Sequence, residues 1–158
     1  MEGFEYYIPE GMLDTPEEPQ VKRGVLEVFG EGDRMNLKDY SKQCHEASYA
    51  NGWWHDPDTG EELPTEGFLG AHVIGCKIGL IGSEASEIME GHRKQKMDEK
   101  LPQYKEMDVE MVDVLIRVFD LAGKMGSPLD EIYAAKMKYN NVRPDHALEN
   151  RKKGGKLY

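Results

Sequence analysis

The stretch that decides the fold is LIGSEASEIMEGHRK, residues 80–94, in which apolar residues recur every three or four positions. This spacing places them on one face of an α-helix, and the same pattern begins near residue 69. The sequence therefore predicts a long helix over residues 69–94. Within it, Glu84 and Glu87 are three residues apart, share a face and are flanked by apolar residues. Two neighbouring carboxylates repel each other, so their placement needs a physical reason.

A second long helix is predicted over residues 103–124, QYKEMDVEMVDVLIRVFDLAGK, and it stops at Gly126. Its polar residues follow one another in steps of four and three and form a narrow stripe along an otherwise apolar helix. The residues of this stripe are Glu106, Glu110, Asp113, Arg117, Asp120 and Lys124. Glu110 and Asp113 repeat the three-residue spacing of the first pair. If the two long helices pack antiparallel, the two pairs of carboxylates can face each other.

Two shorter helices complete the expected fold. Asn36, with Asp39 three residues on, has the pattern of a capped helix start and predicts a helix to about residue 50. Ser127-Pro128 opens a last helix that runs to about residue 141. Four helices with little extended structure predict an all-α fold with a four-helix-bundle-like subunit. Three glycines of the first long helix permit a neighbour to pack closely: Gly75, Gly79 and Gly82.

The chain divides into a central helical part and two end segments. Residues 1–35 are acidic and contain prolines without a helical period, which predicts an N-terminal extension rather than a second domain. Its stretch GVLEVFGEGD, residues 24–33, favours a short strand or hairpin, so the extension is expected to be a short irregular or β-containing arm. Residues 36–143 form the helical domain, and residues 144–158 form a basic, glycine-containing tail.

Composition excludes several classes of protein. The formal net charge of −10 leaves no broad cationic surface for nucleic acid. No apolar run is long enough to cross a bilayer, and the N-terminus lacks the pattern of a signal peptide. The two cysteines, Cys44 and Cys76, have no metal-type spacing, which favours a reducing compartment. We expect a cytoplasmic protein that binds neither nucleic acid nor membranes.

The paired carboxylates have two interpretations. Four converging carboxylates repel strongly unless a divalent cation lies among them, and hard oxygen ligands favour Mg²⁺ or Mn²⁺ over Zn²⁺. A di-iron site is disfavoured because its usual Glu-x-x-His pairs are missing here. In the other interpretation, each acidic pair belongs to a solvated face, and the stripe on residues 103–124 is the solvent side of a mostly buried helix.

Several of these stretches together resemble a known family. They are LIGSEASEIMEGHRK, VEMVDVLIRVFDLAGKMG, KMKYNNVRP, a late GGK and CHEASYANGWW. Over about residues 36–158 the chain resembles the MazG-like, all-α nucleoside triphosphate pyrophosphohydrolases, above all the short single-domain members of phages and bacteria. Those members are similar to this chain in reading S-E-x-x-E where others read E-E-x-x-E. The tail departs from the pattern, because DHALENRK separates Pro144 from GGK by more residues than usual.

The resemblance implies an activity. Members of the family cut a (deoxy)nucleoside triphosphate between the α- and β-phosphates, which releases a monophosphate and pyrophosphate and controls nucleotide pools. They bind two or three Mg²⁺ ions per site, with Mn²⁺ as a substitute, through motif carboxylates that match Glu84, Glu87, Glu110 and Asp113. They are homodimers or homotetramers with sites at the subunit interface. Some phage members, which work in the host cytoplasm, prefer purine deoxynucleotides.

The resemblance also implies residues that bind substrate. Lys136, Asn140 and Arg143 match the family's K-x-x-x-N-x-x-R pattern, which contacts phosphate. Arg93 is a further phosphate candidate, although a cation at a helix C-terminus also complements the helix dipole. His45, Trp53 and Trp54 match residues at the nucleobase pocket. An aromatic face can stack on any base, but either tryptophan could instead cap the core.

Two other functions stay open from sequence. The chain could be a non-catalytic helical binding or regulatory protein that keeps the family fold. It could also be a pyrophosphohydrolase of another nucleotide, such as a phosphoribosyl nucleotide.

Overall fold

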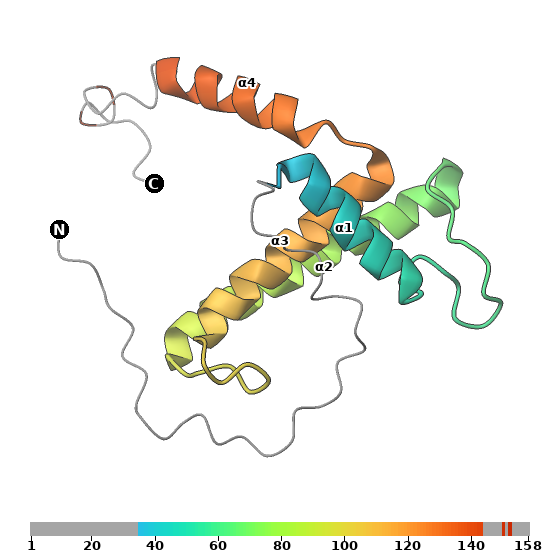
Figure 1. Cartoon of the computed structure of the whole chain (residues 1–158), viewed down its shortest axis with the longest axis horizontal. Helices are drawn as coiled ribbons and strands as arrows, with labels where there is room; N and C mark the ends of the chain where they lie inside the picture. The colour runs from blue at the N-terminus through green and yellow to red at the C-terminus, as the bar shows by residue number, and fades with distance from the viewer. Residues whose placement is uncertain (1–34, 144–149, 151, 153–158) are drawn as a thin grey trace. The chain divides into compact units, whose positions relative to one another are not determined.

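The computed structural model describes residues 35–143, 150 and 152, and Figure 1 shows its four helices. They are α1 (Leu37–Ala50), α2 (Gly67–Lys94), α3 (Glu106–Met125) and α4 (Leu129–Val142). Within the described residues there is no strand beyond two isolated bridges, so the predicted all-α class is confirmed. The predicted arm over residues 1–35 and the tail over 144–158 fall almost entirely outside these residues. The chain divides into two units, Met1–Arg34 and Met35–Tyr158, and all four helices belong to the second.

The helix ends follow from local sequence. The amide of Asp39 donates to the Asn36 side chain at 2.9 Å, and the amide of Asn36 donates to the Asp39 carboxylate at 3.1 Å, which confirms the predicted cap. α3 ends at Gly126, whose φ of 64° is left-handed. It begins later than predicted, because the Asp98 carboxylate accepts from two loop amides, at residues 100 and 101, and holds the connection in a turn.

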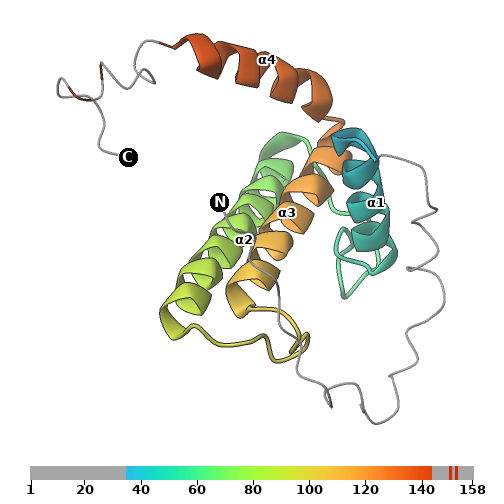
Figure 2. The same ribbon diagram turned by 60° about the vertical axis from the view of Figure 1, so that its left-hand side comes forward.

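α2 and α3 lie side by side and antiparallel, and α1 packs on α3 (Figures 1 and 2). The close contacts occur at glycines that the sequence pattern did not single out. A Cβ on Gly91 would lie 2.8 Å from the amide nitrogen of Met107, and one on Gly123 would lie 2.4 Å from the carbonyl oxygen of Ser41. These two glycines let the backbones of α2 and α1 approach that of α3 closely.

α4 packs against α1 and is otherwise exposed along its length. At its first turn the Asp130 carboxylate accepts from the amides of Leu37 and Lys38, both at 3.0 Å. These are the first amides of α1, so one carboxylate satisfies donors that a helix start leaves unpaired. Figure 2 shows the rest of α4 leading away from α2 and α3.

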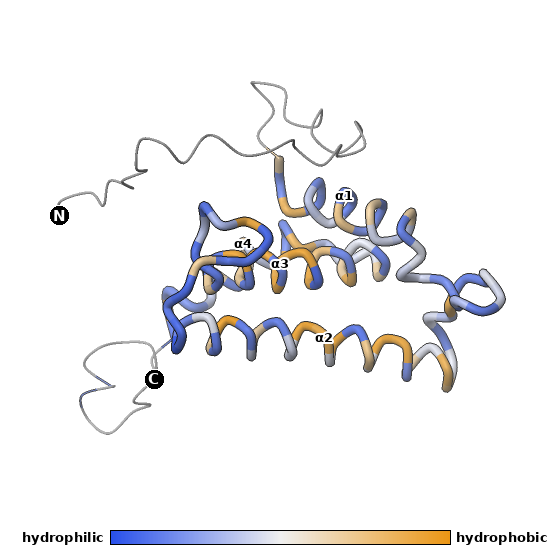
Figure 3. The backbone as a smooth tube through the Cα atoms, turned by 90° about the horizontal axis from the view of Figure 1, so that it is seen from below, coloured by the Kyte–Doolittle hydropathy of each residue, from blue (hydrophilic) through white to orange (hydrophobic). Residues whose placement is uncertain are grey.

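The interior is polar and much of the apolar surface is exposed. Among the described residues, the buried hydrophobic ones are Trp54 and Ala122. Glu110 and Asp120 are only 9% and 5% exposed, whereas Leu115 of the same helix is 50% exposed. The interpretation of the α3 stripe as a solvent face is therefore wrong, because this stripe faces α1 and α2. Figure 3 shows hydrophobic residues recurring along both long helices.

The three glycines expected to admit a close neighbour do not do so within this subunit. A Cβ on Gly75, Gly79 or Gly82 would have nothing within 4 Å. Of the helices in the described part of the chain, none has both the length and the apolar character that crossing a membrane requires.

Candidate metal centre

Three of the four predicted metal ligands come together between α2 and α3. One carboxylate oxygen from each of Glu84, Glu87 and Glu110 can be chosen so that all three lie within 4.8 Å of one another. The Glu84 side chain is 12% exposed and Glu110 is 9% exposed, while Glu87 lies at the surface. These three residues, called here the carboxylate cluster, occupy adjoining turns of the two antiparallel helices.

The electrostatics of the cluster are unfavourable as it stands. Burial raises the pKa of Glu110, and the negative charges of Glu87, Asp113 and Glu84 raise it further. Burial also raises the pKa of Asp113, with the charge of Glu84 as the next cause. The fourth predicted ligand therefore lies beside the cluster, although it is outside the set that meets within 4.8 Å. Within the described residues, no group donates a hydrogen bond to Glu110.

One cation contacts the cluster. The Nε and Nη2 atoms of Arg117 both donate to Oε1 of Glu84, at 3.1 and 3.0 Å. Arg117 also lowers the pKa of Asp113, against the larger effect of burial. From the sequence, Arg117 was predicted only as a member of the polar stripe, without a role. Its position four residues after Asp113, on the same helix face, was the signal that could have indicated one.

The donor set fits a hard divalent cation. Carboxylate oxygens from two rigid helices can supply ligands to Mg²⁺ or Mn²⁺, and water or a substrate phosphate can fill the remaining positions. A divalent charge at this place would also offset the repulsion that raises the pKa values of Glu110 and Asp113. Glu84, Glu87, Glu110 and Asp113 are therefore the residues of this chain that could hold such an ion.

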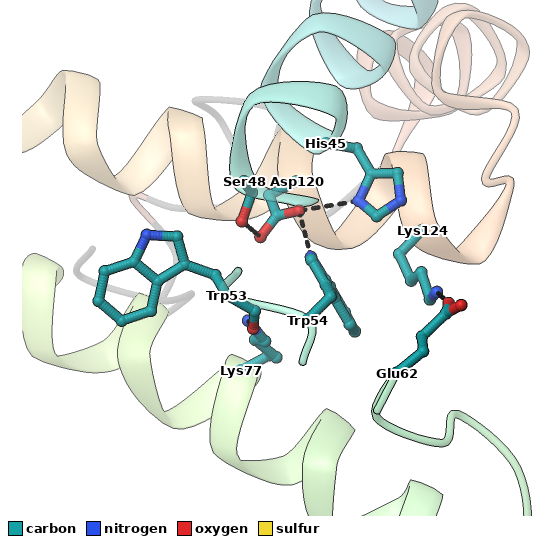
Figure 4. A network of polar contacts seen from close by, with 8 residues as sticks. All are labelled: His45, Ser48, Trp53, Trp54, Glu62, Lys77, Asp120 and Lys124. Carbon is teal, nitrogen blue, oxygen red and sulfur yellow. Dashed lines mark hydrogen bonds and ion pairs between the residues drawn. The ribbon is translucent and has the colours of Figure 1, made fainter. Parts of the chain in front are cut away.

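Further along the stripe, Asp120 is the centre of a buried hydrogen-bond network (Figure 4). Its carboxylate accepts from the indole nitrogen of Trp54 at 2.7 Å and from the Ser48 hydroxyl at 2.8 Å. It also lies 3.0 Å from Nδ1 of His45, which donates when it carries a proton. Asp120 on α3 thus joins α1 to the loop that carries Trp54. The spacing of charges in the sequence indicated no role for Asp120.

The two tryptophans have different environments. Trp54 is 0% exposed, between Lys77 at 4.3 Å and Lys124 at 5.2 Å from its ring, so it has no face open to a base. This burial favours the alternative in which Trp54 caps the core over a place at the nucleobase pocket. Trp53 is 61% exposed, and its carbonyl oxygen accepts from Lys77 Nζ at 2.6 Å. Figure 4 shows the Trp53 ring turned away from His45, with Trp54 between them.

His45 borders a cavity of about 470 Å³ between α1 and the junction of α3 with α4. Its lining includes Lys38, Ser41, Gly123, Ser127 and Asp130. Gly123 follows Glu110 by thirteen residues, a rise of roughly 20 Å along a helix. This cavity is therefore separate from the carboxylate cluster, and His45 and Trp53 do not line one pocket in this structure.

The predicted phosphate ligands are spread over two helices. Arg93 is 73% exposed on α2 and pairs with Glu90 at 3.0 Å. Lys136 and Asn140 lie on α4, and Arg143 directly follows its last residue. This helix packs on α1 rather than on the helices of the carboxylate cluster. Lys136 Nζ lies 5.3 Å from the ring centre of Tyr139 on the same helix. Within one subunit, then, the structure does not bring the α4 residues to the cluster.

Comparisons with known proteins place no relative beside this chain. No family model matches it, and neither the curated proteins nor the solved structures include a match.

Proposed function

We propose that this protein is a Mg²⁺-dependent hydrolase that converts (deoxy)nucleoside triphosphates to a monophosphate and pyrophosphate. The observation that carries the proposal is the cluster of Glu84, Glu87 and Glu110, three carboxylate oxygens within 4.8 Å of one another. Glu84 and Glu110 are shielded from water, and Glu87 lies at the surface. The resemblance of the surrounding motifs to the MazG-like pyrophosphohydrolases supports the choice of reaction.

The charge of the chain agrees with a metal-dependent site. A nucleoside triphosphate carries about four negative charges, which a protein of net charge −10 repels unless a cation intervenes. Bound divalent ions supply that charge, polarise the phosphoryl oxygens and lower the pKa of a bound water. The role of the protein is to hold four carboxylates on two helices so that the ions and the triphosphate meet in one place.

The reaction needs no covalent intermediate with the protein. A water oxygen forms a bond to the α-phosphorus, and the bond from that phosphorus to the α–β bridging oxygen breaks. Pyrophosphate leaves with the bonding electron pair, and the proton of the water passes to a carboxylate or to solvent.

Stacking on the base is assigned to an exposed aromatic ring. Trp53 offers an open aromatic ring on which a base can stack, and its backbone is fixed by Lys77. We propose a purine deoxynucleotide as the preferred substrate, by the resemblance to phage members, and nucleotide-pool control as the role. The expected compartment is the cytoplasm, that of the host for a phage protein.

We further propose that the functional unit is a homodimer or homotetramer. A subunit whose described buried hydrophobic residues are Trp54 and Ala122 has too small a core to be stable alone. Five apolar residues on α2 and α3 are each 41–56% exposed: Ile78, Met111, Val112, Leu115 and Ile116. A second copy with the same apolar faces would cover them and could bring Lys136, Asn140 and Arg143 to its partner's cluster. Sedimentation velocity should show a species larger than the 18.0 kDa subunit.

Product analysis tests the activity. Each common NTP and dNTP is incubated with the protein and Mg²⁺, or with EDTA, and the products are separated by anion-exchange chromatography. We expect monophosphate and pyrophosphate in equal amounts with Mg²⁺ and neither with EDTA. Glu84→Gln and Asp113→Asn should lose this activity, whereas Glu46→Gln, an exposed site on α1, should keep it. Intact substrates under every metal condition would refute the proposal.

A further inference from the structure

Arg117 makes an unusual ion pair for an arginine beside a carboxylate. Two of its nitrogens donate to a single oxygen, Oε1 of Glu84, rather than one nitrogen to each oxygen as in a fork-to-fork pair. The Oε2 atom of Glu84 is therefore outside the pair. Within the described residues, Nη1 of Arg117 makes no hydrogen bond, and the side chain is 34% exposed. One edge of the guanidinium thus remains open to an anion.

Stability alone is a weak reason for this arrangement. A partly buried ion pair loses in desolvation much of what it gains in attraction. Arg117 nevertheless pairs with Glu84, which belongs to the cluster. It is the one cation paired with this cluster in the part of the chain that the structure describes. In the absence of a metal ion, the positive charge of Arg117 reduces the repulsion among these carboxylates.

A divalent ion and Arg117 both require the negative charge of Glu84. When the ion is present, it supplies the compensation that Arg117 otherwise gives, and the attraction of Arg117 to Glu84 weakens because two cations now share one carboxylate. The guanidinium is planar and presents several donors, a geometry that matches phosphate oxygens. A triphosphate held at the cluster would lie within reach of its open edge.

We propose that Arg117 is a phosphate-binding residue that exchanges partners, pairing with Glu84 in the empty site and with a phosphate of the nucleotide in the loaded site. This inference rests on the proposed function, since it takes a metal-bound nucleoside triphosphate as the ligand. It has a distinctive consequence. Removing Arg117 strengthens metal binding, because a competing cation is gone, and weakens nucleotide binding, because a phosphate ligand is gone.

Two titrations test the exchange without relying on turnover. Calorimetry measures the affinity for Mn²⁺ alone, and then for the α,β-imido analogues of dGTP and dATP in the presence of Mn²⁺. The variants are Arg117→Gln, which removes the charge, and Arg117→Lys, which keeps the charge but not the fork. Lys42→Gln is the matched control, because it removes one positive charge from a 73% exposed position on α1.

For Arg117→Gln we expect Mn²⁺ to bind at least about threefold more tightly and an analogue to bind about tenfold or more weakly. Arg117→Lys should bind Mn²⁺ as the wild type does and an analogue with intermediate affinity. Lys42→Gln should change neither affinity. Thermal melting of each variant verifies folding, and Arg117→Lys serves if Arg117→Gln does not fold.

Three results would overturn the inference and are distinguishable from one another. If wild type binds the analogues and Arg117→Gln binds them equally, Arg117 does not contact phosphate, while the proposed function stands. If Arg117→Gln binds Mn²⁺ no more tightly than wild type, there is no exchange at Glu84. If wild type binds Mn²⁺ but neither analogue, the nucleotide function itself fails together with the role of Arg117.

Discussion

Glu110 and Asp120 are both buried carboxylates of α3, ten residues apart on one polar stripe, yet their surroundings differ. Asp120 accepts from Trp54 and Ser48 and contacts His45, so its oxygens are satisfied by the protein. Glu110 has carboxylates as neighbours, and no group among the described residues donates to it. A buried carboxylate whose donors the fold supplies is structural, whereas one set among other carboxylates without a donor indicates a missing cation.

Glu110→Gln should show the largest effect on activity. We expect pyrophosphate release to fall by about a thousandfold, because a neutral amide is a poor ligand for a hard divalent cation. Without metal, the same variant should be at least as stable as the wild type, since it removes one charge from a repelling group. Hydrolysis assays and urea unfolding in EDTA measure the two effects, with Glu46→Gln as the control. A large loss of stability would show that Glu110 is structural after all.

Asp120→Asn should behave in the opposite way. The amide keeps the shape of the carboxylate, but its NH₂ group faces hydrogen-bond donors. The negative charge that attracts these donors is also lost. We expect the free energy of unfolding to fall by about 2–4 kcal/mol. Urea unfolding at one fixed protein concentration measures it, since an oligomer's stability depends on concentration. An unchanged midpoint would remove the distinction between the two carboxylates.

Trp54→Phe tests one of the hydrogen bonds that Asp120 accepts. The smaller ring leaves a cavity at a fully buried position, and the indole N–H that donates to Asp120 at 2.7 Å is lost. We expect a loss of about 2–3 kcal/mol, from the buried acceptor left one donor short and from the cavity together. Trp53→Phe is the matched control, because its ring is 61% exposed and no hydrogen bond to its indole nitrogen occurs among the described residues. Equal losses in both variants would mean that neither the burial of Trp54 nor its hydrogen bond contributes to stability.

The smallest expected effect is a pH dependence of stability in the metal-free protein. The pKa values of Glu110 and Asp113 are raised on folding, so the folded state binds protons more readily than the unfolded state. Their contribution makes the protein less stable as pH rises from the ordinary carboxyl range through the raised pKa values. The lowered pKa values of Glu62 and Glu90 act on the acid side of that range.

Urea unfolding in EDTA over a pH series that starts at the ordinary carboxyl value of 4.5 and runs upward measures this slope, compared between wild type and Glu110→Gln. The decrease with pH should be weaker in the variant, and Mg²⁺ should abolish it in the wild type. A wild type whose stability rises over this range faster than that of the variant would contradict the raised pKa of Glu110.

The sequence predicted the fold and the carboxylate cluster better than the environments of the residues around that cluster. The helical period and the cap at Asn36 located the four helices to within a few residues. The three-residue spacing of the acidic pairs predicted a meeting of carboxylates between the two long helices, and Glu84, Glu87 and Glu110 do meet there. Spacing could not tell which side of α3 faces inward, because apolar residues cover most of its circumference and the deciding contacts are long-range. It also could not separate Trp53 from Trp54, since adjacent residues differ only in what they meet after folding.

The packing of α4 was beyond prediction for a related reason. Its pattern of Lys136, Asn140 and Arg143 is read from the chain alone, whereas their neighbours depend on tertiary packing, which here joins α4 to α1. The roles of Arg117 and Asp120 were missed because charge spacing does not reveal which acid a donor will reach.

The most direct test of a metal site at Glu84, Glu87 and Glu110 is an anomalous difference map from crystals grown with Mn²⁺. We expect a peak between Glu84, Glu87 and Glu110, within bonding distance of at least two of their oxygens, in wild type and not in Glu110→Gln. No peak should lie at Asp120, whose oxygens are already occupied by donors. Ordered carboxylates with no peak in wild type, under conditions where Mn²⁺ is in excess, would contradict the account.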